Sequence, residues 1–133
     1  MPFVDAHAHI YPEKIATKAM QSVADFYVMR GAGGGSSEWL LNRTAETPIT
    51  NFIVHSVAVK ASNVETINNF ISEECKIHPE FVGFGTMHPD YENMEAEVIR
   101  AIDLGLHGFK IHPDTQFVNI DDPRLMRFYE IIE

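Results

Sequence analysis

The stretch FVGFGTMHPDYENMEAEVIRAIDLGLHGFKIH, residues 81–112, decides the fold of this chain. It opens with an apolar run from Phe81 to Met87, continues with apolar residues three or four positions apart, and closes with a second run from His107 to His112. The two runs are typical of strands, and the spacing between them is typical of an amphipathic helix. We expect Asp90 to cap this helix and Gly105 to end it in the left-handed conformation. The stretch therefore predicts a strand–helix–strand unit of a parallel sheet.

The part of the chain before this stretch repeats the same alternation. Strands are predicted over residues 3–9 and over Asn51–Val59, each followed by apolar residues at helical spacing. The first helix is expected from Pro12 to Arg30. At the start of the next one, Ser62 and Glu65 have the spacing of a capping box.

Shorter segments connect these units. Residues 31–37 (GAGGGSS) are expected to form a flexible loop; it lacks the Lys-Ser/Thr ending of a P-loop and follows no strand, so it does not indicate a nucleotide site. A short helix is predicted over Glu38–Thr47, and a last helix is predicted to begin at Asp122 and Pro123. The sequence thus predicts an α/β protein of the (β/α)8 TIM-barrel type. The chain would carry about the first four β/α units in a single domain, residues 1–133.

Composition and charge argue against several classes of protein. Hydrophobic residues make up 45% of the 133 residues, enough for a folded core. The net charge of −9, with only 10 Lys and Arg, argues against a nucleic-acid partner. No stretch approaches the roughly 20 apolar residues that cross a bilayer, and a strand that starts at residue 3 leaves no room for a signal peptide. We therefore expect no membrane association and a cytoplasmic location, which the single Cys75 also fits.

His7 and His9, in the first predicted strand, are the strongest candidates for chemistry. Side chains two residues apart lie on the same face of a strand, so both imidazoles point the same way. Neutral imidazole is the commonest protein ligand of zinc and similar ions. The pair therefore predicts a divalent metal site with zinc as the favoured ion. Two histidines hydrogen-bonded to neighbouring groups are the alternative interpretation of the same pattern.

Polar side chains also mark the ends of the other predicted strands. His55 lies on the second strand, His88 follows the third, and Lys110 and His112 lie on the fourth. A TIM barrel builds its active site at these ends. An inward lysine is costly unless it meets a carboxylate, forms a metal-bridging carbamate or binds an anionic substrate. We therefore predict catalytic roles for Lys110 and His112. For His55 and His88, a structural hydrogen-bonded histidine is at least as good an interpretation.

Three motifs follow one another at the spacing of β/α units: VDAHAH (residues 4–9), GFGTMHP (residues 83–89) and GFKIHP (residues 108–113). Together they resemble the metal-dependent amidohydrolase superfamily, and within it the amidohydrolase-2 group, which includes aminocarboxymuconate-semialdehyde decarboxylase-like enzymes. The resemblance implies a distorted TIM barrel that holds zinc or another divalent metal, with His7 and His9 as ligands from the first strand. The metal would activate water for hydrolysis, or orient a small-molecule substrate for non-oxidative decarboxylation.

Members of this group are considerably longer than this chain, and they take further metal ligands and an essential aspartate from later strands. Three explanations fit that difference. The chain is the N-terminal half of a longer protein, or two copies associate to close a barrel, or it is a stable remnant with a binding role. An isolated parallel sheet needs both faces and both edges covered, so we expect a homo-oligomer such as a dimer, or else a missing C-terminal half.

The function expected first is that of a metal-dependent hydrolase, in which metal-activated water attacks a small-molecule substrate. Lys110 or His112 would bind an anionic group of the substrate or stabilise developing negative charge, and an aspartate outside this sequence would act as general base. A metal-dependent non-oxidative decarboxylase of the same group is one alternative. A non-catalytic binding or interaction domain is the other.

Overall fold

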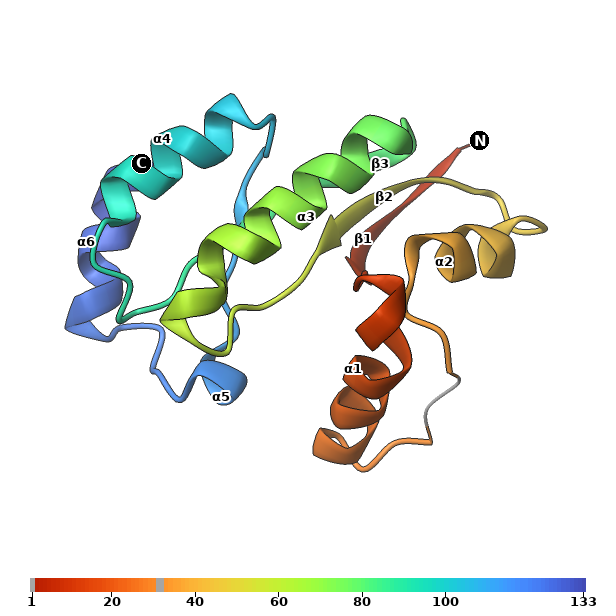
Figure 1. Ribbon diagram of the computed structural model, residues 1–133, viewed down its shortest axis with the longest axis horizontal. Coiled ribbons are helices and arrows are strands. Elements are labelled where there is room, and N and C mark those ends of the chain that lie inside the picture. The colour runs from red at the N-terminus through yellow and green to blue at the C-terminus, as the bar shows by residue number, and fades with distance from the viewer. Residues whose placement is uncertain (1, 31–32) are drawn as a thin grey trace.

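The computed structural model describes residues 2–30 and 33–133, and every strand pairing in these residues is parallel. The strands form two small sheets (Figure 1). The first has the order β1 (Phe3–His9), β2 (Ile49–His55) and β3 (Phe81–Gly83), and the second pairs β4 (Gly85–Thr86) with β5 (Phe109–Lys110).

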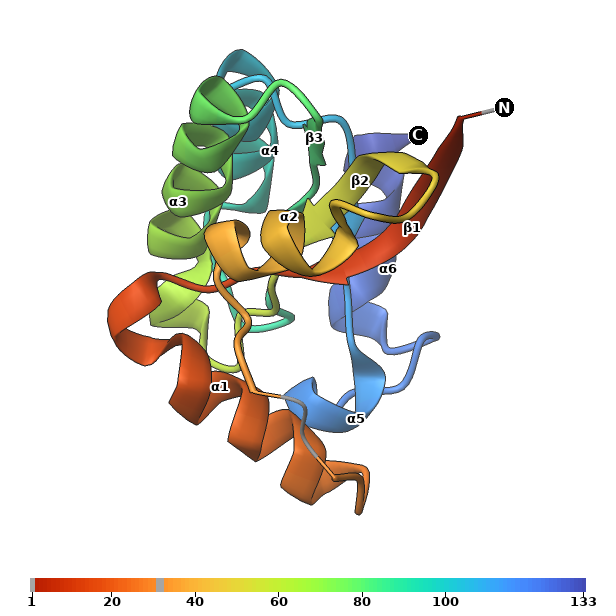
Figure 2. The same ribbon diagram turned by 90° about the vertical axis from the view of Figure 1, so that its right-hand side faces the viewer.

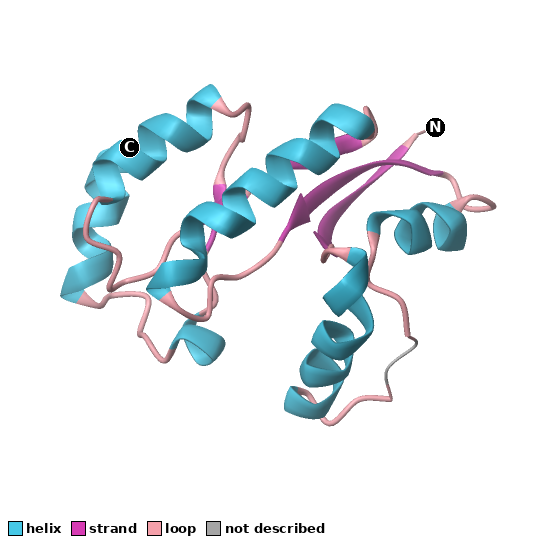
Figure 3. Ribbon diagram, viewed as in Figure 1, coloured by secondary structure: helices cyan, strands magenta, loops and turns pink. Residues whose placement is uncertain are grey.

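Helices alternate with these strands, as Figure 3 shows by colour. They are α1 (Glu13–Phe26), α2 (Ser37–Thr44), α3 (Val64–Ile77), α4 (Met94–Asp103), α5 (Pro113–Gln116) and α6 (Pro123–Ile132), with a 3₁₀ turn over Ala61–Asn63. None of the helices in the described residues is both long and apolar enough to cross a bilayer.

The predicted third strand, Phe81–Met87, is divided between the two sheets. Phe84 lies at the division, where its backbone N–H donates to the carbonyl of Val54 at 2.9 Å. At the next residue the partner changes, because the backbone N–H of Gly85 donates to the carbonyl of Gly108 at 2.8 Å. The two sheets are therefore continuous, because the extended segment 81–86 pairs first with β2 and then with β5. Their strands follow one another in chain order, as in part of a TIM barrel.

Glycine allows close packing along this segment. A Cβ atom at Gly83 would lie 2.8 Å from Sγ of Cys75 and 2.9 Å from Cδ2 of Leu106, closer than atoms can pack. A Cβ atom at Gly108 would lie 2.7 Å from the ring of Phe84. The motifs GFG and GF thus permit α3 and the neighbouring segments to lie directly against the strands.

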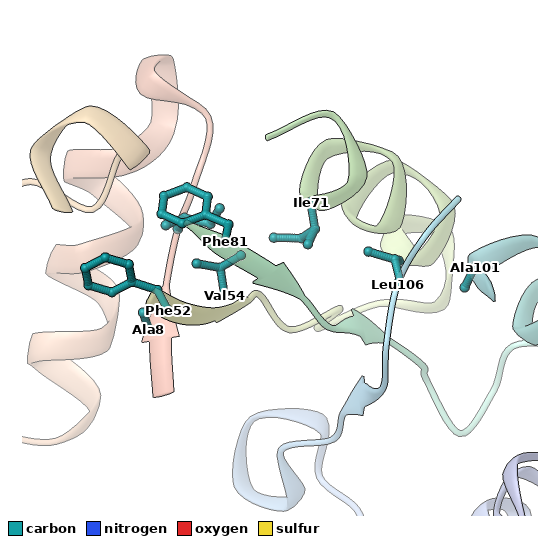
Figure 4. Close-up of a cluster of buried hydrophobic side chains, with 8 residues drawn as sticks. Ala8, Phe52, Val54, Ile71, Phe81, Ala101 and Leu106 are labelled. Carbon is teal, nitrogen blue, oxygen red and sulfur yellow. The ribbon is translucent and has the colours of Figure 1, made fainter. Parts of the chain in front are cut away.

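The main hydrophobic core lies between the first sheet and helices α3 and α4 (Figure 4). In it the rings of Phe52 and Phe81 meet edge to face, with centroids 5.9 Å apart. Its buried members are Ala8, Ile10, Phe52, Val54, Ile71, Phe81, Ala101 and Leu106, and Leu40 and Leu41 of α2 pack against them. A second cluster joins the starts of α3 and α4 to α6 through Val64, Met94, Val98 and Phe128. These two cores hold the strands in the register that positions their ends.

Two helices lie beyond the C-terminal ends of the strands. Figure 2 shows α1 and α5 on this side, whereas α3, α4 and α6 surround the sheets. Tyr27, directly after α1, contacts His112, directly before α5. The region past the strand ends is therefore built from segments that follow β1 and β5.

Two predicted helix boundaries are confirmed, the C-terminal end at Gly105 and the N-terminal cap at Asp122. Gly105 has φ of +85°, and the backbone N–H of Leu106 closes the turn on the carbonyl of Ala101 at 3.0 Å. Asp122 accepts a 2.9 Å hydrogen bond from the backbone N–H of Arg124, and Pro123 takes the first helical position.

Two predicted helix caps are absent, and the carboxylates of Glu65 and Asp90 have other partners. Ser62 lies inside the 3₁₀ turn and no capping side chain bonds at the start of α3, while the Glu65 carboxylate accepts from the hydroxyl of Tyr91 at 2.6 Å. Asp90 lies before α4 without capping it, and instead pairs with Arg124 at 2.6 Å. Tertiary contacts thus engage both carboxylates that the local signals assigned to caps.

The predicted first helix also ends early, at Phe26 rather than Arg30. Val28 has φ of +54°, and the backbone N–H of Met29 donates to the carbonyl of Ala24 at 2.8 Å. This is the left-handed turn that usually ends a helix at glycine, here formed by valine. The sequence therefore carries no glycine signal at this position.

Other boundaries differ by a few residues. The second strand covers Ile49–His55 instead of Asn51–Val59, the fourth shortens to Phe109–Lys110 from His107–His112, and the short helix covers Ser37–Thr44 instead of Glu38–Thr47. Ser37 thus belongs to a helix and not to the predicted loop 31–37, of which residues 31 and 32 lie outside the described residues. The single turn α5 was not predicted.

Candidate metal centre

Three histidines meet where β1 and β2 end. The two strands are adjacent and parallel, and His9 and His55 are partners in their register. His7 lies two residues earlier on β1, where the register with β2 shifts between Asp5 and Ala8, and its ring still lies beside that of His9, with centroids 5.1 Å apart. Its Nε2 atom lies 3.1 Å from Nε2 of His9.

The third ring faces both of the others. The His55 ring stands nearly perpendicular to those of His7 and His9, with centroids 4.6 and 4.5 Å away. One nitrogen from each ring lies within 4.8 Å of the other two. Among the described residues this is the group of side chains whose spacing suits a metal ion.

The donor set fits zinc or a similar divalent ion. Zinc binds imidazole nitrogen at about 2.0–2.1 Å in tetrahedral geometry, which places neighbouring ligand nitrogens about 3.3 Å apart. The 3.1 Å separation of the His7 and His9 nitrogens already matches this spacing. Asp5 does not belong to the converging group, and its carboxylate accepts the backbone N–H of His7 at 3.0 Å.

Desolvation and neighbouring charges favour the neutral form of these rings, which binds metal. Desolvation, followed by the nearby His7 and the positive charge of Lys110, lowers the pKa of His9 to about 4. Desolvation and the two neighbouring histidines lower the pKa of His55 to about 3. The pKa of His7 is also lowered, mainly by desolvation and by Lys110. Each ring therefore offers a lone pair near pH 7 without first losing a proton.

These shifts predict how the stability of the metal-free chain depends on pH. Well above pH 6.5, His9 and His55 are neutral in both the folded and the unfolded chain. Below pH 6.5 the two histidines become protonated in the unfolded chain while they stay neutral in the folded chain. The free energy of unfolding should fall as the pH drops from 6.5 toward 4, by up to about 1.4 kcal/mol per pH unit for each histidine. Urea denaturation at several pH values measures this slope. A His9→Gln variant should show a shallower slope, and an unchanged slope would contradict the assignment.

The positive charge of Lys110 contributes to the lowered pKa of all three rings. Its backbone carbonyl accepts from the hydroxyl of Thr86 at 3.1 Å, which fixes the end of β5 beside β4. A positive charge next to neutral imidazoles is suited to hold an anion.

His112 is brought to the same region but has other partners. Its Nε2 atom and the hydroxyl of Tyr27 lie 2.7 Å apart, and its backbone N–H donates to the side chain of Gln116 at 2.8 Å. The other ring nitrogen, Nδ1, is buried without a hydrogen-bond partner among the described residues. His112 is therefore held between the end of α1 and α5.

Sequence reasoning missed two positioning side chains. The amide of Gln116 donates to the carbonyls of Ala58 and Met87 at 2.9 and 2.7 Å, and so ties α5 to the chain that follows β2 and β4. Tyr27 holds His112 across 85 positions of sequence. Neither residue belongs to a motif, so the sequence carried no signal for either.

His55 and His88 differ in their surroundings. His88 accepts the backbone N–H of Asp90 at 3.1 Å, which fits the structural role considered for it. His55 lies in the cluster, and its Nδ1 atom has no hydrogen-bond partner among the described residues. Its place at a strand end was the one signal that pointed to a functional role.

The chain is similar to known proteins over nearly its whole length. The model of the family described as amidohydrolase matches residues 4–133. Among solved structures, the chain is similar to the crystal structure of a 2,6-dihydroxybenzoate decarboxylase complexed with 2,6-dihydroxybenzoate, with a TM-score of 0.62 and 18% sequence identity. The match covers 97% of this chain and 46% of the decarboxylase, so the chain spans about half the length of that enzyme. The search of curated proteins found no match.

Proposed function

The chain belongs to the amidohydrolase family, and from this premise we propose that it carries the metal-binding part of a metal-dependent enzyme that acts on a small anionic molecule. The observation that carries the proposal is the convergence of the His7 and His9 nitrogens, 3.1 Å apart, at the ends of parallel strands. Active sites of barrels of this type are built at these strand ends.

His7 and His9 would hold the ion through their Nε2 atoms. A divalent metal bound there would act as a Lewis acid, either lowering the pKa of water for hydrolysis or holding a substrate carboxylate for decarboxylation. Zinc is the ion we propose, because the donors are neutral imidazoles.

Lys110 and His112 would bind the substrate. The ammonium group of Lys110 would pair with an anionic group and keep it next to the imidazoles. His112, fixed by Tyr27 and Gln116, would donate to or accept from a polar group at the rim of the site. No residue in the cluster is a carboxylate, so the general base of a hydrolytic reaction would come from outside the cluster.

Hydrolysis of a small molecule is the reaction we propose first, in keeping with the family. Non-oxidative decarboxylation is the second candidate, favoured by the similarity to the 2,6-dihydroxybenzoate decarboxylase and by a lysine beside the metal-binding histidines. We also propose a cytoplasmic location.

A covering partner is part of the proposal. β1 pairs with β2 alone in the sheet as described, and Phe3 and Val4 on it are more than half exposed. An uncovered edge of this kind pairs readily with another strand. A second copy of the chain, or the remaining half of a barrel, would cover it and bring further ligands to the site.

Binding of 2,6-dihydroxybenzoate to the zinc-loaded chain tests the anion site. Calorimetry should show binding that weakens tenfold or more in a Lys110→Met variant. Lys60→Met is the matched control, because Lys60 is an exposed lysine in the segment after β2. Equal weakening in both variants, or none in Lys110→Met, would contradict the role of Lys110. Release of carbon dioxide by the loaded chain would favour decarboxylation over hydrolysis.

A further inference from the structure

We infer that His55 is a third ligand of the same metal, so that this chain alone provides three imidazoles and leaves one coordination position open. The inference rests on the proposed metal site at His7 and His9 and extends it to a second strand. It also changes what the chain needs from elsewhere, because two histidines alone bind zinc weakly and three with an open position are the donor set of a catalytic zinc.

The backbone places His55 for this role. His55 is the last residue of β2, and its Cα atom is the register partner of His9 on β1. Neighbouring parallel strands lie close enough for opposite side chains on one face to touch. The convergence of the three rings therefore follows from strand pairing and does not depend on a flexible loop.

The His55 ring makes no hydrogen bond through Nδ1 that would explain its position as structural. The residue is only 3% exposed, yet its Nδ1 atom has no hydrogen-bond partner among the described residues. Buried polar atoms are nearly always hydrogen-bonded, so an unpartnered one needs an explanation. The side chains that face the ring are His7 and His9, each edge-on to it, and no carboxylate belongs to the group. His7 and His9 lie within hydrogen-bond distance of each other, but Nδ1 of His55 has no such partner among the described residues. An unpartnered imidazole nitrogen beside two further imidazoles fits a shared cation.

The distances permit the same ion to reach all three. His7 and His9 already have the spacing of ligands in a tetrahedral site. The nitrogen of His55 lies within 4.8 Å of theirs, so closing to the tetrahedral spacing needs a movement of at most about 1.5 Å. Rotation of an imidazole about its side-chain bonds covers this distance without a change in the backbone.

Metal titration of a His55→Ala variant tests the inference. We expect the dissociation constant for Zn²⁺, measured by competition with a chromogenic chelator, to rise a hundredfold or more relative to the unmodified chain. Bound Co²⁺ should lose the intense visible absorption of a four-coordinate site. The matched control is His88→Ala, which removes a buried histidine at the next strand end that lies outside the cluster. Its zinc affinity should stay within threefold of the unmodified chain.

The outcomes separate this inference from the proposed function. If the unmodified chain binds zinc and His55→Ala binds it equally well, His55 is not a ligand while the site at His7 and His9 stands. If the unmodified chain binds no zinc, the proposed function itself fails. Circular dichroism and thermal unfolding of the metal-free variants establish that they fold. Should His55→Ala unfold, His55→Asn keeps a polar group at the position, and the Co²⁺ spectrum of that variant decides the question.

Discussion

Replacing His7 with alanine is expected to abolish metal retention. His7 supplies one of the two nitrogens that already have the spacing of zinc ligands, and the side chain is exposed, so its loss removes a ligand without opening a cavity in the core. Loss of one of so few ligands should weaken zinc binding at least a hundredfold, which corresponds to about 2.7 kcal/mol or more. Zinc competition with a chromogenic chelator measures the change.

The control for this variant is His107→Ala. His107 is an exposed histidine at the beginning of the fourth strand segment, outside the cluster, and its structural contact is made by the backbone N–H, which the substitution keeps. Equal zinc affinity in the His7→Ala and unmodified chains would show that bound zinc lies elsewhere, for example on surface carboxylates.

The largest expected loss of stability comes from Asn68→Ala. The Asn68 side chain is fully buried, accepts the backbone N–H of Thr86 at 2.7 Å, and donates to the carbonyl of Thr86 at 3.2 Å and to the carboxylate of Glu97 at 2.6 Å. Alanine would leave a strand N–H without its partner and would remove one donor from a carboxylate that is only 2% exposed. We expect the free energy of unfolding to fall by about 3 kcal/mol or more.

Urea denaturation measures this change, and Asn69→Ala is its matched control. Asn69 is the same residue type one position later, is exposed, and accepts a hydrogen bond from Arg100. Its replacement should cost less than about 1 kcal/mol. A similar loss in both variants would mean that the buried amide contributes no more than a surface contact. The result also bears on the site, because the hydroxyl of Thr86 holds the backbone of Lys110.

The alternating strands and helices were predictable because each element carries its own periodicity and end signals. Gly105 and Asp122 show this, since a left-handed glycine and an acidic residue before proline act through their immediate neighbours. The capping box predicted at Ser62 and Glu65 does not form, which shows the limit of such local signals. The carboxylate of Glu65 found a better partner in Tyr91, 26 positions away, which no local pattern reveals.

The candidate site was predictable to the extent that it lies on one strand. His7 and His9 share a face because of the pleat, and the sequence alone states this. Recognising His55 required the register between β1 and β2, which is set by packing across the sheet. The contact between Tyr27 and His112 depends in the same way on tertiary packing, because it joins the end of α1 to a residue 85 positions later.

The most direct test of a metal centre built from imidazoles is zinc K-edge X-ray absorption of the loaded chain. The chain has 19 acidic residues, so the measurement must distinguish zinc on imidazoles from adventitious zinc on carboxylates. Our account predicts a first shell that includes three nitrogen ligands at about 2.0–2.1 Å, with the outer-shell scattering of imidazole rings. A first shell of oxygen atoms without ring scattering would contradict it.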